Sequence, residues 1–171
     1  MNAFTNVSIK EFSINPFISI GKEWMLISSA KADGSTNTMT AAWGGLGWLW
    51  ERPVAFIFVR QTRYTKEFID ESGKVSLSFL GMGFRKQLAY LGSASGRDED
   101  KIAKSGLNIV DNDGIPFFEE ARLAIFGHVI ASELIPMESF MDDTIAKNHY
   151  ADKNLHTMYV VQIDEILEKE Q

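Results

Sequence analysis

Apolar runs and turn signals alternate along the early part of the chain. Residues 24–30 form an apolar run rich in β-favouring side chains. The Asp33-Gly34 pair that follows is a strong hairpin signal, because both residues tolerate positive φ. Residues 38–43 are expected to return as the partner strand. The pattern therefore predicts an antiparallel hairpin over this segment.

Two more strands flank a short predicted helix. Continuous branched and aromatic character over residues 54–59 predicts a strand buried on both faces, whereas apolar and polar residues alternate over residues 74–80. Between these runs, Thr62 or Thr65 is placed to cap a helix, and Gly73 supplies the left-handed residue that ends it. The predicted order is strand, turn, helix, strand.

Two further helices are predicted from apolar spacing and end signals. Residues 84–91 carry apolar side chains at helical spacing, and Gly92 is expected to stop that helix. Asp98 is then expected to cap a second helix over residues 99–105, with acids at its start as the helix dipole prefers. Gly106 closes it.

The last third of the chain reads as two long strands, residues 122–134 and 156–167. The polar stretch 138–153 between them is expected to be a helix or a mobile cover. Several strands interrupted by short helices, without strict β-α-β alternation, are typical of a barrel-like α+β domain that is mainly β. Because no linker or repeat interrupts the chain, residues 1–171 are expected to form one domain.

Composition narrows the class of protein. The 171 residues are 45% hydrophobic and 23% charged, which suffices for a sizeable core. The 17 Lys and Arg against 23 Asp and Glu give a formal charge of -6, which argues against nucleic acid and anionic membrane surfaces as partners. The sequence shows no signal-peptide pattern and no apolar run approaching about 18 residues, so a cytoplasmic protein is expected.

The side-chain inventory limits the chemistry. Cysteine is absent, which excludes disulfides, iron–sulfur ligation and thiol redox chemistry. The three histidines, His128, His149 and His156, match no metal-binding spacing, so no metal site is expected. If the protein moves electrons, a bound cofactor must carry them.

A cationic segment follows the strand predicted at residues 54–59. Residues 60–65 read Arg-Gln-Thr-Arg-Tyr-Thr, so two arginines bracket hydroxyl side chains at a predicted helix start. Planar guanidinium forks, hydroxyl donors and free helix N–H groups together suit a phosphate. The alternative is that Arg60 and Arg63 pair with surface carboxylates.

Two other segments suggest the same kind of ligand. Small and polar residues at 37–45 would expose strand backbone to a flat heterocycle, although an ordinary edge strand facing water shows the same pattern. The Ser- and Arg-containing turn at 93–101 could wrap an anion, or simply leave Arg97 solvated. Trp48 and Trp50, in a predicted loop, favour a subunit interface.

These segments together resemble a known family. Asn-x-Met-Thr-x-x-Trp from residue 37, Arg-x-x-Arg-Tyr-Thr from residue 60 and Ser-Gly-Arg-Asp-x-Asp-Lys from residue 95 are similar to those of the flavin reductase-like, flavoredoxin-type FMN-binding split-barrel proteins. The resemblance spans roughly residues 24–106. It implies a homodimer of six-stranded split β-barrels with short flanking helices, each binding FMN without covalent attachment near the subunit interface.

The resemblance also implies roles for individual residues. The segment from Met39 would lie along the isoalloxazine ring through backbone groups, and the two cationic turns would hold the ribityl phosphate. Many relatives carry serine where Ala41 or Ala42 stands, so a side-chain hydrogen bond to the flavin is missing here. The implied cofactor-binding residues are Met39, Thr40, Ala41, Ala42, Arg60, Thr62, Arg63, Tyr64, Thr65, Ser95 and Arg97.

Three functions follow as hypotheses. The leading one is an FMN-binding oxidoreductase of flavin reductase or flavoredoxin type, which passes electrons from NADH or NADPH through the flavin to a small-molecule or protein acceptor. No protein acid or base is assigned, because hydride transfer to flavin N5 does not require one. The second is a flavin-binding electron carrier or sensor without nicotinamide turnover. The third is a split barrel that uses the groove for another ligand or only for association.

Overall fold

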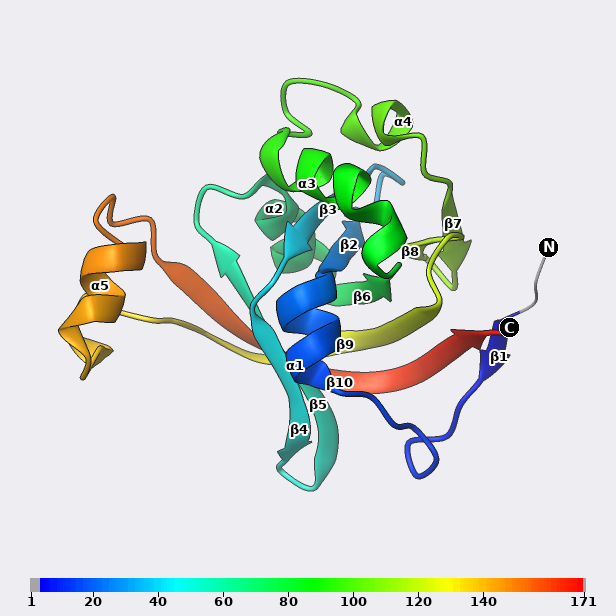
Figure 1. Ribbon diagram of the computed structural model, residues 1–171, viewed down its shortest axis with the longest axis horizontal. Helices are drawn as coiled ribbons and strands as arrows, with labels where there is room; N and C mark the ends of the chain where they lie inside the picture. The colour runs from blue at the N-terminus through cyan, green and yellow to red at the C-terminus, as the bar shows by residue number, and fades with distance from the viewer. Residues whose placement is uncertain (1–3, 171) are drawn as a thin grey trace.

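Eight antiparallel strands form one curled sheet in the computed structural model, which describes residues 4–170 (Figure 1). The strand order is β3-β2-β6-β9-β10-β5-β4, and β1 pairs with β10. The strands of the sheet are β1 (Phe4–Asn6), β2 (Met25–Ala30), β3 (Thr36–Ala41), β4 (Gly44–Leu49), β5 (Arg52–Arg60), β6 (Lys74–Phe79), β9 (Leu123–Leu134) and β10 (His156–Lys169). A separate two-stranded ribbon consists of β7 (Ile109–Asn112) and β8 (Ile115–Phe118).

A two-residue link makes the sheet curl. β3 and β4 stand at opposite ends of the hydrogen-bonded order, yet only Ala42 and Trp43 separate them in sequence. Three Cα steps span at most about 11 Å, so the two edge strands must come close together. They meet without pairing, and the result is a barrel with an open seam. The predicted split-barrel fold is confirmed, and its sheet has more strands than the six expected.

Apolar side chains fill the inside of the barrel. Val75, Leu77 and Phe79 point into the main core, as their alternation predicts. Ser76 and Ser78 are also fully buried, because the β7–β8 ribbon covers the opposite face of β6. Ser76 Oγ donates to the carbonyl of a β8 residue, and Ser78 Oγ accepts from a β8 amide, so neither hydroxyl is unsatisfied.

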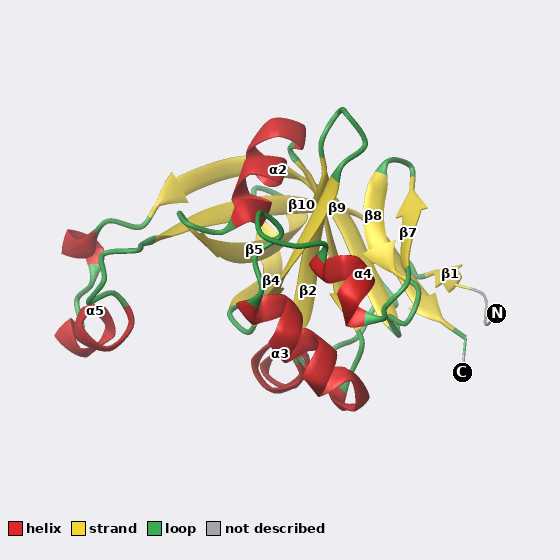
Figure 2. Cartoon of the chain, turned by 90° about the horizontal axis from the view of Figure 1, so that it is seen from above, coloured by secondary structure: helices red, strands yellow, loops and turns green. Residues whose placement is uncertain are grey.

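Short helices surround the sheet (Figure 2). Between α3 and the sheet lies a second apolar cluster that includes Leu26, Leu88 and Leu91. The helices are α1 (Pro16–Ile18), which continues into the π-helical turn η1 (Ser19–Glu23), α2 (Tyr64–Ser72), the 3₁₀ turn η2 (Met82–Phe84), α3 (Arg85–Ser93), α4 (Lys101–Ser105), the 3₁₀ turn η3 (Met137–Ser139) and α5 (Asp143–His149).

Three predicted helix ends differ from the structure. The N-cap of α2 is Arg63, which makes no side-chain capping bond, so the capping role predicted for Thr62 or Thr65 is wrong. Helix α3 continues through Gly92 to its last residue, Ser93. The side chain of Asp100, not Asp98, caps α4 by accepting from the amide of its third residue. The left-handed ends at Gly73 and Gly106 are as predicted.

The segment predicted as a loop around the tryptophans is the hairpin of β4 and β5. Trp48 lies in β4, paired opposite Pro53, and Trp50 stands in the tight turn at φ 50°. Repeated glycines lower the strand propensity of β4, which explains why its pattern resembled a loop. The polar stretch after β9 carries η3 and α5, which project from the body at the ends of the two longest strands (Figures 1 and 2).

Gly127 of β9 provides a test of the close packing between β9 and β10. A Cβ there would lie 2.0 Å from the backbone oxygen of Gln162, which no rotamer change can relieve. We expect Gly127→Ala to lower the free energy of unfolding by about 3 kcal/mol, measured by urea denaturation. Gly83→Ala is the control, because a Cβ at Gly83 meets nothing within 4 Å. Equal stability of the two variants would contradict this packing.

Candidate functional site

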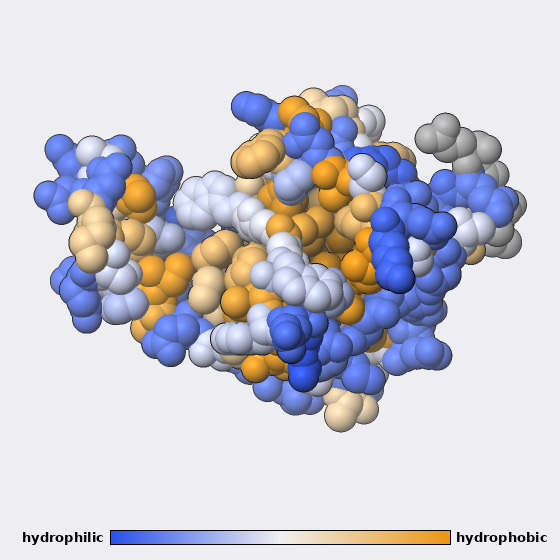
Figure 3. All heavy atoms as spheres, turned by 90° about the horizontal axis from the view of Figure 1, so that it is seen from below, coloured by the Kyte–Doolittle hydropathy of each residue, from blue (hydrophilic) through white to orange (hydrophobic). Residues whose placement is uncertain are grey.

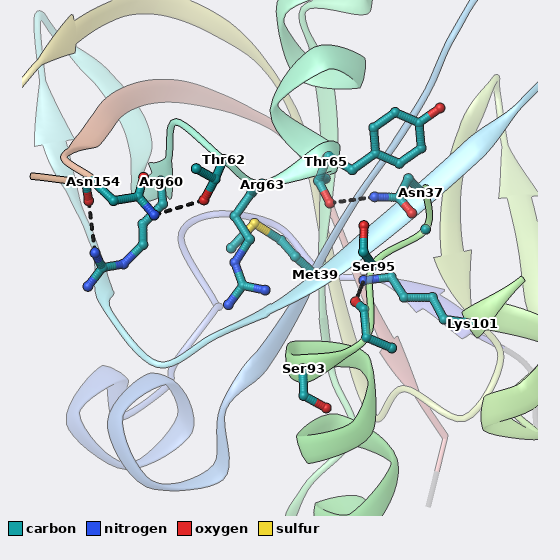
Figure 4. A pocket seen from close by; sticks show the side chains of 13 residues that line it. Asn37, Met39, Arg60, Thr62, Arg63, Thr65, Ser93, Ser95, Lys101 and Asn154 are labelled. Carbon is teal, nitrogen blue, oxygen red and sulfur yellow. Dashed lines mark hydrogen bonds between the residues drawn. The ribbon is translucent and has the colours of Figure 1, made fainter. Parts of the chain in front are cut away.

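A polar cavity of about 280 Å³ opens where four chain segments meet (Figure 4). The segments are the start of β3, the turn from β5 into α2, the turn from α3 toward α4, and the stretch between α5 and β10. This polar cavity is lined by Asn37, Met39, Arg60, Thr62, Arg63, Tyr64, Thr65, Ser93, Ala94, Ser95, Gly96, Lys101 and Asn154. The structure therefore brings together side chains from all three segments that the sequence singled out.

Backbone carbonyls at the end of α3 bind two of the cationic side chains that line the polar cavity. Arg63 Nη1 donates to the carbonyl of Gly92 at 2.6 Å, and Lys101 Nζ donates to the carbonyls of Leu91 and Ala94, both at 2.9 Å. The last carbonyls of a helix lack intrahelical partners and carry partial negative charge, so they suit cations. Both cationic groups are thereby fixed at the wall of the polar cavity.

Burial leaves this positive charge poorly solvated. Desolvation, assisted by the nearby charge of Arg63, lowers the pKa of Lys101 to about 8. Desolvation also lowers the pKa of Arg63, and the charge of Arg60 adds to the effect. Like charges close together in a desolvated space favour an anionic partner, because an anion compensates both costs. The polar cavity is therefore suited to a phosphate.

Two asparagines orient the hydroxyl groups of the polar cavity. Asn37 Nδ2 donates to Thr65 Oγ1 at 2.8 Å, and Asn154 Nδ2 donates to Thr62 Oγ1 at the same distance. A hydroxyl that accepts one hydrogen bond keeps its own proton for another acceptor. Thr62 and Thr65 are therefore prepared as donors to an anion, which is a different task from helix capping.

The start of α2 adds backbone donors. Because its N-cap residue makes no side-chain bond, the first-turn N–H groups have no side-chain acceptor there. Tyr64 and Thr65, the first two residues of this nine-residue helix, both line the polar cavity. A helix N-terminus favours anions through its N–H groups and its dipole. Its place beside Arg63 and Lys101 concentrates positive potential on one spot.

Arg60 and Arg97 lie on different sides of this cluster. Arg60 lines the polar cavity while donating to the carbonyls of Asn154 and His149, at 2.8 and 2.9 Å. Arg97 does not line it. Its guanidinium donates to the carbonyl of Thr62 at 3.1 Å, pairs with a glutamate of α2, and lies 4.6 Å from the centre of the Tyr64 ring. Arg97 faces a neighbouring cavity of about 670 Å³.

A second cavity, of about 300 Å³, continues from the polar cavity along the open edge of β3. The two share Met39, Arg60 and Arg63. This strand-edge cavity is lined by Met39, Thr40, Ala41, Ala42, Trp43, Phe58, Arg60, Arg63 and His156. Because β3 pairs only with β2, backbone groups on its other side can bond a flat ligand with polar edges. All eleven predicted residues except Arg97 line one of the two joined cavities.

His156 stands at the inner wall of the strand-edge cavity as a neutral ring. Burial, with the charges of Arg60 and Arg63, lowers its pKa to about 4. Its Nδ1 lies 2.8 Å from the hydroxyl of Tyr150, and its ring centre is 5.2 Å from that of Trp43. An uncharged, aromatic wall of this kind suits a flat ring.

Sequence reasoning missed several lining residues. Lys101 ends the third motif, but its amine lines the polar cavity because it bonds the carbonyls of Leu91 and Ala94, and no local pattern reveals those contacts. Asn154, Phe58 and His156 come from segments with no motif. Their placement depends on the pairing of β5 with β10, in which His156 faces Arg60, and local patterns do not reveal that pairing.

Comparison with known proteins decides the family. The model of the family described as "Flavin reductase like domain" matches residues 19–171. The chain belongs to the flavin reductase-like family. The predicted resemblance is thereby confirmed, over a longer stretch than the motifs alone cover.

Known proteins resemble this flavin reductase-like protein in sequence or in fold. The Uncharacterized protein YddH of Escherichia coli K12 is 36% identical over 90 residues, which are 52% of this chain and 47% of that protein, so the match spans about half of each. Flavoredoxin of Desulfovibrio vulgaris (Miyazaki F) is 25% identical with a TM-score of 0.67, covering 86% of this chain and 69% of that one. An FMN-binding domain of a flavin reductase-like enzyme from Shewanella baltica OS155 has a TM-score of 0.69 at 17% identity, covering 98% and 78%.

The donor set of the flavin reductase-like site fits FMN. Cations, hydroxyls and a helix start converge in the polar cavity, where a phosphate would bind, and the strand-edge cavity offers backbone and aromatic surface for a flat ring. Within residues 4–170, no three His, Asp or Glu side chains come together as a metal site. None of the helices described is long and apolar enough to cross a membrane.

Proposed function

We propose that this flavin reductase-like protein binds FMN and passes electrons from NADH or NADPH through it to an acceptor. The observation that carries the proposal is the junction of the two cavities at Met39, Arg60 and Arg63. It offers a cationic end for a phosphate and an open strand edge for a ring, in one continuous groove. The bound flavin supplies the electron chemistry, and the protein supplies binding and orientation.

Each part of the groove has its own role in the proposal. In the polar cavity, Arg60, Thr62, Arg63, Tyr64, Thr65 and Ser95 hold the phosphate, and Lys101 joins them. Along the strand edge, Met39, Thr40, Ala41 and Ala42 support the ring. Arg97 acts indirectly, because it holds the Thr62 carbonyl and the Tyr64 ring in position without lining the polar cavity itself. His156 and Phe58 exclude water from the ring.

We also propose a homodimer of single-domain chains. Trp48 and Trp50 are 68% and 59% exposed on the β4–β5 hairpin. Residues 135–155, which carry η3 and α5, form the α5 arm, and apolar side chains also gather at the surface between this arm and the body (Figure 3). Exposed aromatic residues on this scale favour a subunit contact. Light scattering measures the assembly directly.

The phosphate assignment predicts the effect of removing Arg63. Arg63→Ala should weaken FMN binding between about tenfold and a hundredfold, because a charge-assisted bond in a desolvated cavity is lost. Fluorescence titration with FMN measures the affinity. Arg52→Ala is the matched control, because Arg52 lies at the other end of β5 and bonds Gln162. Unchanged affinity in Arg63→Ala would place the phosphate elsewhere.

The buried lysine predicts a pH dependence. The pKa of Lys101 is about 8 in the free protein, and a bound phosphate raises it because the anion favours the charged amine. The protein therefore binds FMN more tightly when Lys101 is protonated, and its affinity for FMN should fall about tenfold between pH 7 and pH 9. Lys101→Met should remove this loss. Lys104→Met should retain it, because Lys104 pairs with Glu99 outside the polar cavity. A pH loss that persists in Lys101→Met would exclude this amine as its source.

Anaerobic mixing tests turnover with nicotinamide donors. Excess NADH or NADPH should bleach the visible absorbance of the FMN-loaded protein, as a hydride passes to the flavin. Boiled protein with the same FMN measures the uncatalysed rate. A flavin that stays oxidised with both donors, but is reduced by a protein partner, would instead establish the electron carrier.

A further inference from the structure

A third cavity, of about 370 Å³, lies between the α1–η1 segment and the link from β3 to β4. Phe17, Ile20 and Gly21 form one side, and Ala42 and Trp43 form the other. Ala42 and Trp43 also line the strand-edge cavity, so this α1 cavity adjoins the proposed position of the flavin ring. Its volume is within the range of small-molecule sites.

The wall of the α1 cavity is apolar and uncharged. None of the described residues that line it is Lys, Arg, Asp or Glu. Phe17 is 83% exposed and Trp43 is also exposed, although large aromatic side chains usually find cover. Two aromatic surfaces beside an open space favour a flat aromatic ligand, which stacks on them.

The backbone around the α1 cavity is unusual and well anchored. The segment from Ser19 to Glu23 is π-helical, a rare form that is frequent at functional sites, and Trp24 follows it at φ 71°, a costly conformation for a bulky residue. Arg85 lies against the Trp24 ring and donates to the carbonyl of Lys22 at 2.7 Å. These contacts hold the strained segment in place.

We propose that the α1 cavity binds a flat, uncharged aromatic electron acceptor of the quinone class. This inference rests on the proposed function, because the reduced flavin is the electron source. The quinone takes two electrons and two protons from the reduced flavin and leaves as the hydroquinone, with oxidised flavin remaining. A nicotinamide dinucleotide fits this cavity poorly, because its two phosphates would find no cation among the lining residues.

Titration of the oxidised, FMN-loaded protein with menadione tests the site. The chain has no cysteine, so this quinone cannot form thiol adducts with it. Phe17→Ala should weaken binding between about twofold and tenfold through the lost stacking. Gly21→Leu should weaken it more than about tenfold, because Gly21 lines the cavity and a Cβ there meets nothing within 4 Å, so the larger side chain has room to occupy the ligand's space.

Ile18→Ala is the matched control, because Ile18 is 47% exposed on the same helix but does not line the cavity. All three variants should keep wild-type FMN affinity and the wild-type rate of flavin reduction by NAD(P)H, while Gly21→Leu raises the KM for menadione. Wild-type menadione affinity in Phe17→Ala and Gly21→Leu would overturn the inference. An equal loss of menadione affinity in Ile18→Ala would also overturn the inference. A dimer that dissociates in Phe17→Ala would overturn it too, because that result assigns this surface to a second subunit.

The two proposals fail separately. A protein that binds FMN and is reduced by NAD(P)H, but binds menadione no better than roughly 1 mM, refutes only the acceptor site. A protein that does not bind FMN refutes the proposed function, and with it the electron source that the acceptor site requires.

Discussion

Ala42 and Trp43 carry the chain from one edge of the sheet to the other, and the geometry of the groove depends on this short link. A hydrogen-bonded closure would have satisfied the outer backbone groups of β3 with another strand. The link instead holds β3 and β4 near each other without pairing, so those groups stay accessible between two cavities. An exposed strand edge commonly invites association, and here it lies in a recess between α1, α3 and β5.

Positive charge at the groove is concentrated by contacts that the chain makes without a ligand. The protein as a whole is acidic, yet Arg63 and Lys101 are bound to carbonyls at one helix end and lie beside the uncapped start of another helix. These contacts fix side chains that would otherwise lose conformational freedom on binding, so less ordering entropy opposes an anion. The same contacts keep Lys101 desolvated, which explains its lowered pKa.

The sequence predicted those features that depend on local patterns. The hairpin at Asp33-Gly34, the long final strands and the glycine ends of α2 and α4 follow from neighbouring residues, and the structure has them. Features that depend on distant partners were not predictable. Ser76 is buried because a ribbon forty residues later covers it, and Thr65 serves a cavity because Asn37 engages its hydroxyl. The motifs identified most residues of the site, whereas the roles of Lys101, Asn154 and His156 became visible only in the folded structure.

Arg60 connects the groove to the α5 arm. Two of its N–H groups hold the carbonyls of His149 and Asn154, and its guanidinium lies 5.4 Å from the centre of the Tyr150 ring. The arm projects beyond the two long strands (Figure 2), and it contacts the barrel mainly through the segment around Arg60, where Asp152 lies 3.6 Å from the guanidinium and Asn154 bonds Thr62. Whatever occupies the polar cavity shares this guanidinium with the arm. Ligand binding in the polar cavity and local opening of the arm are therefore thermodynamically linked. Each changes the free energy of the other by the same amount.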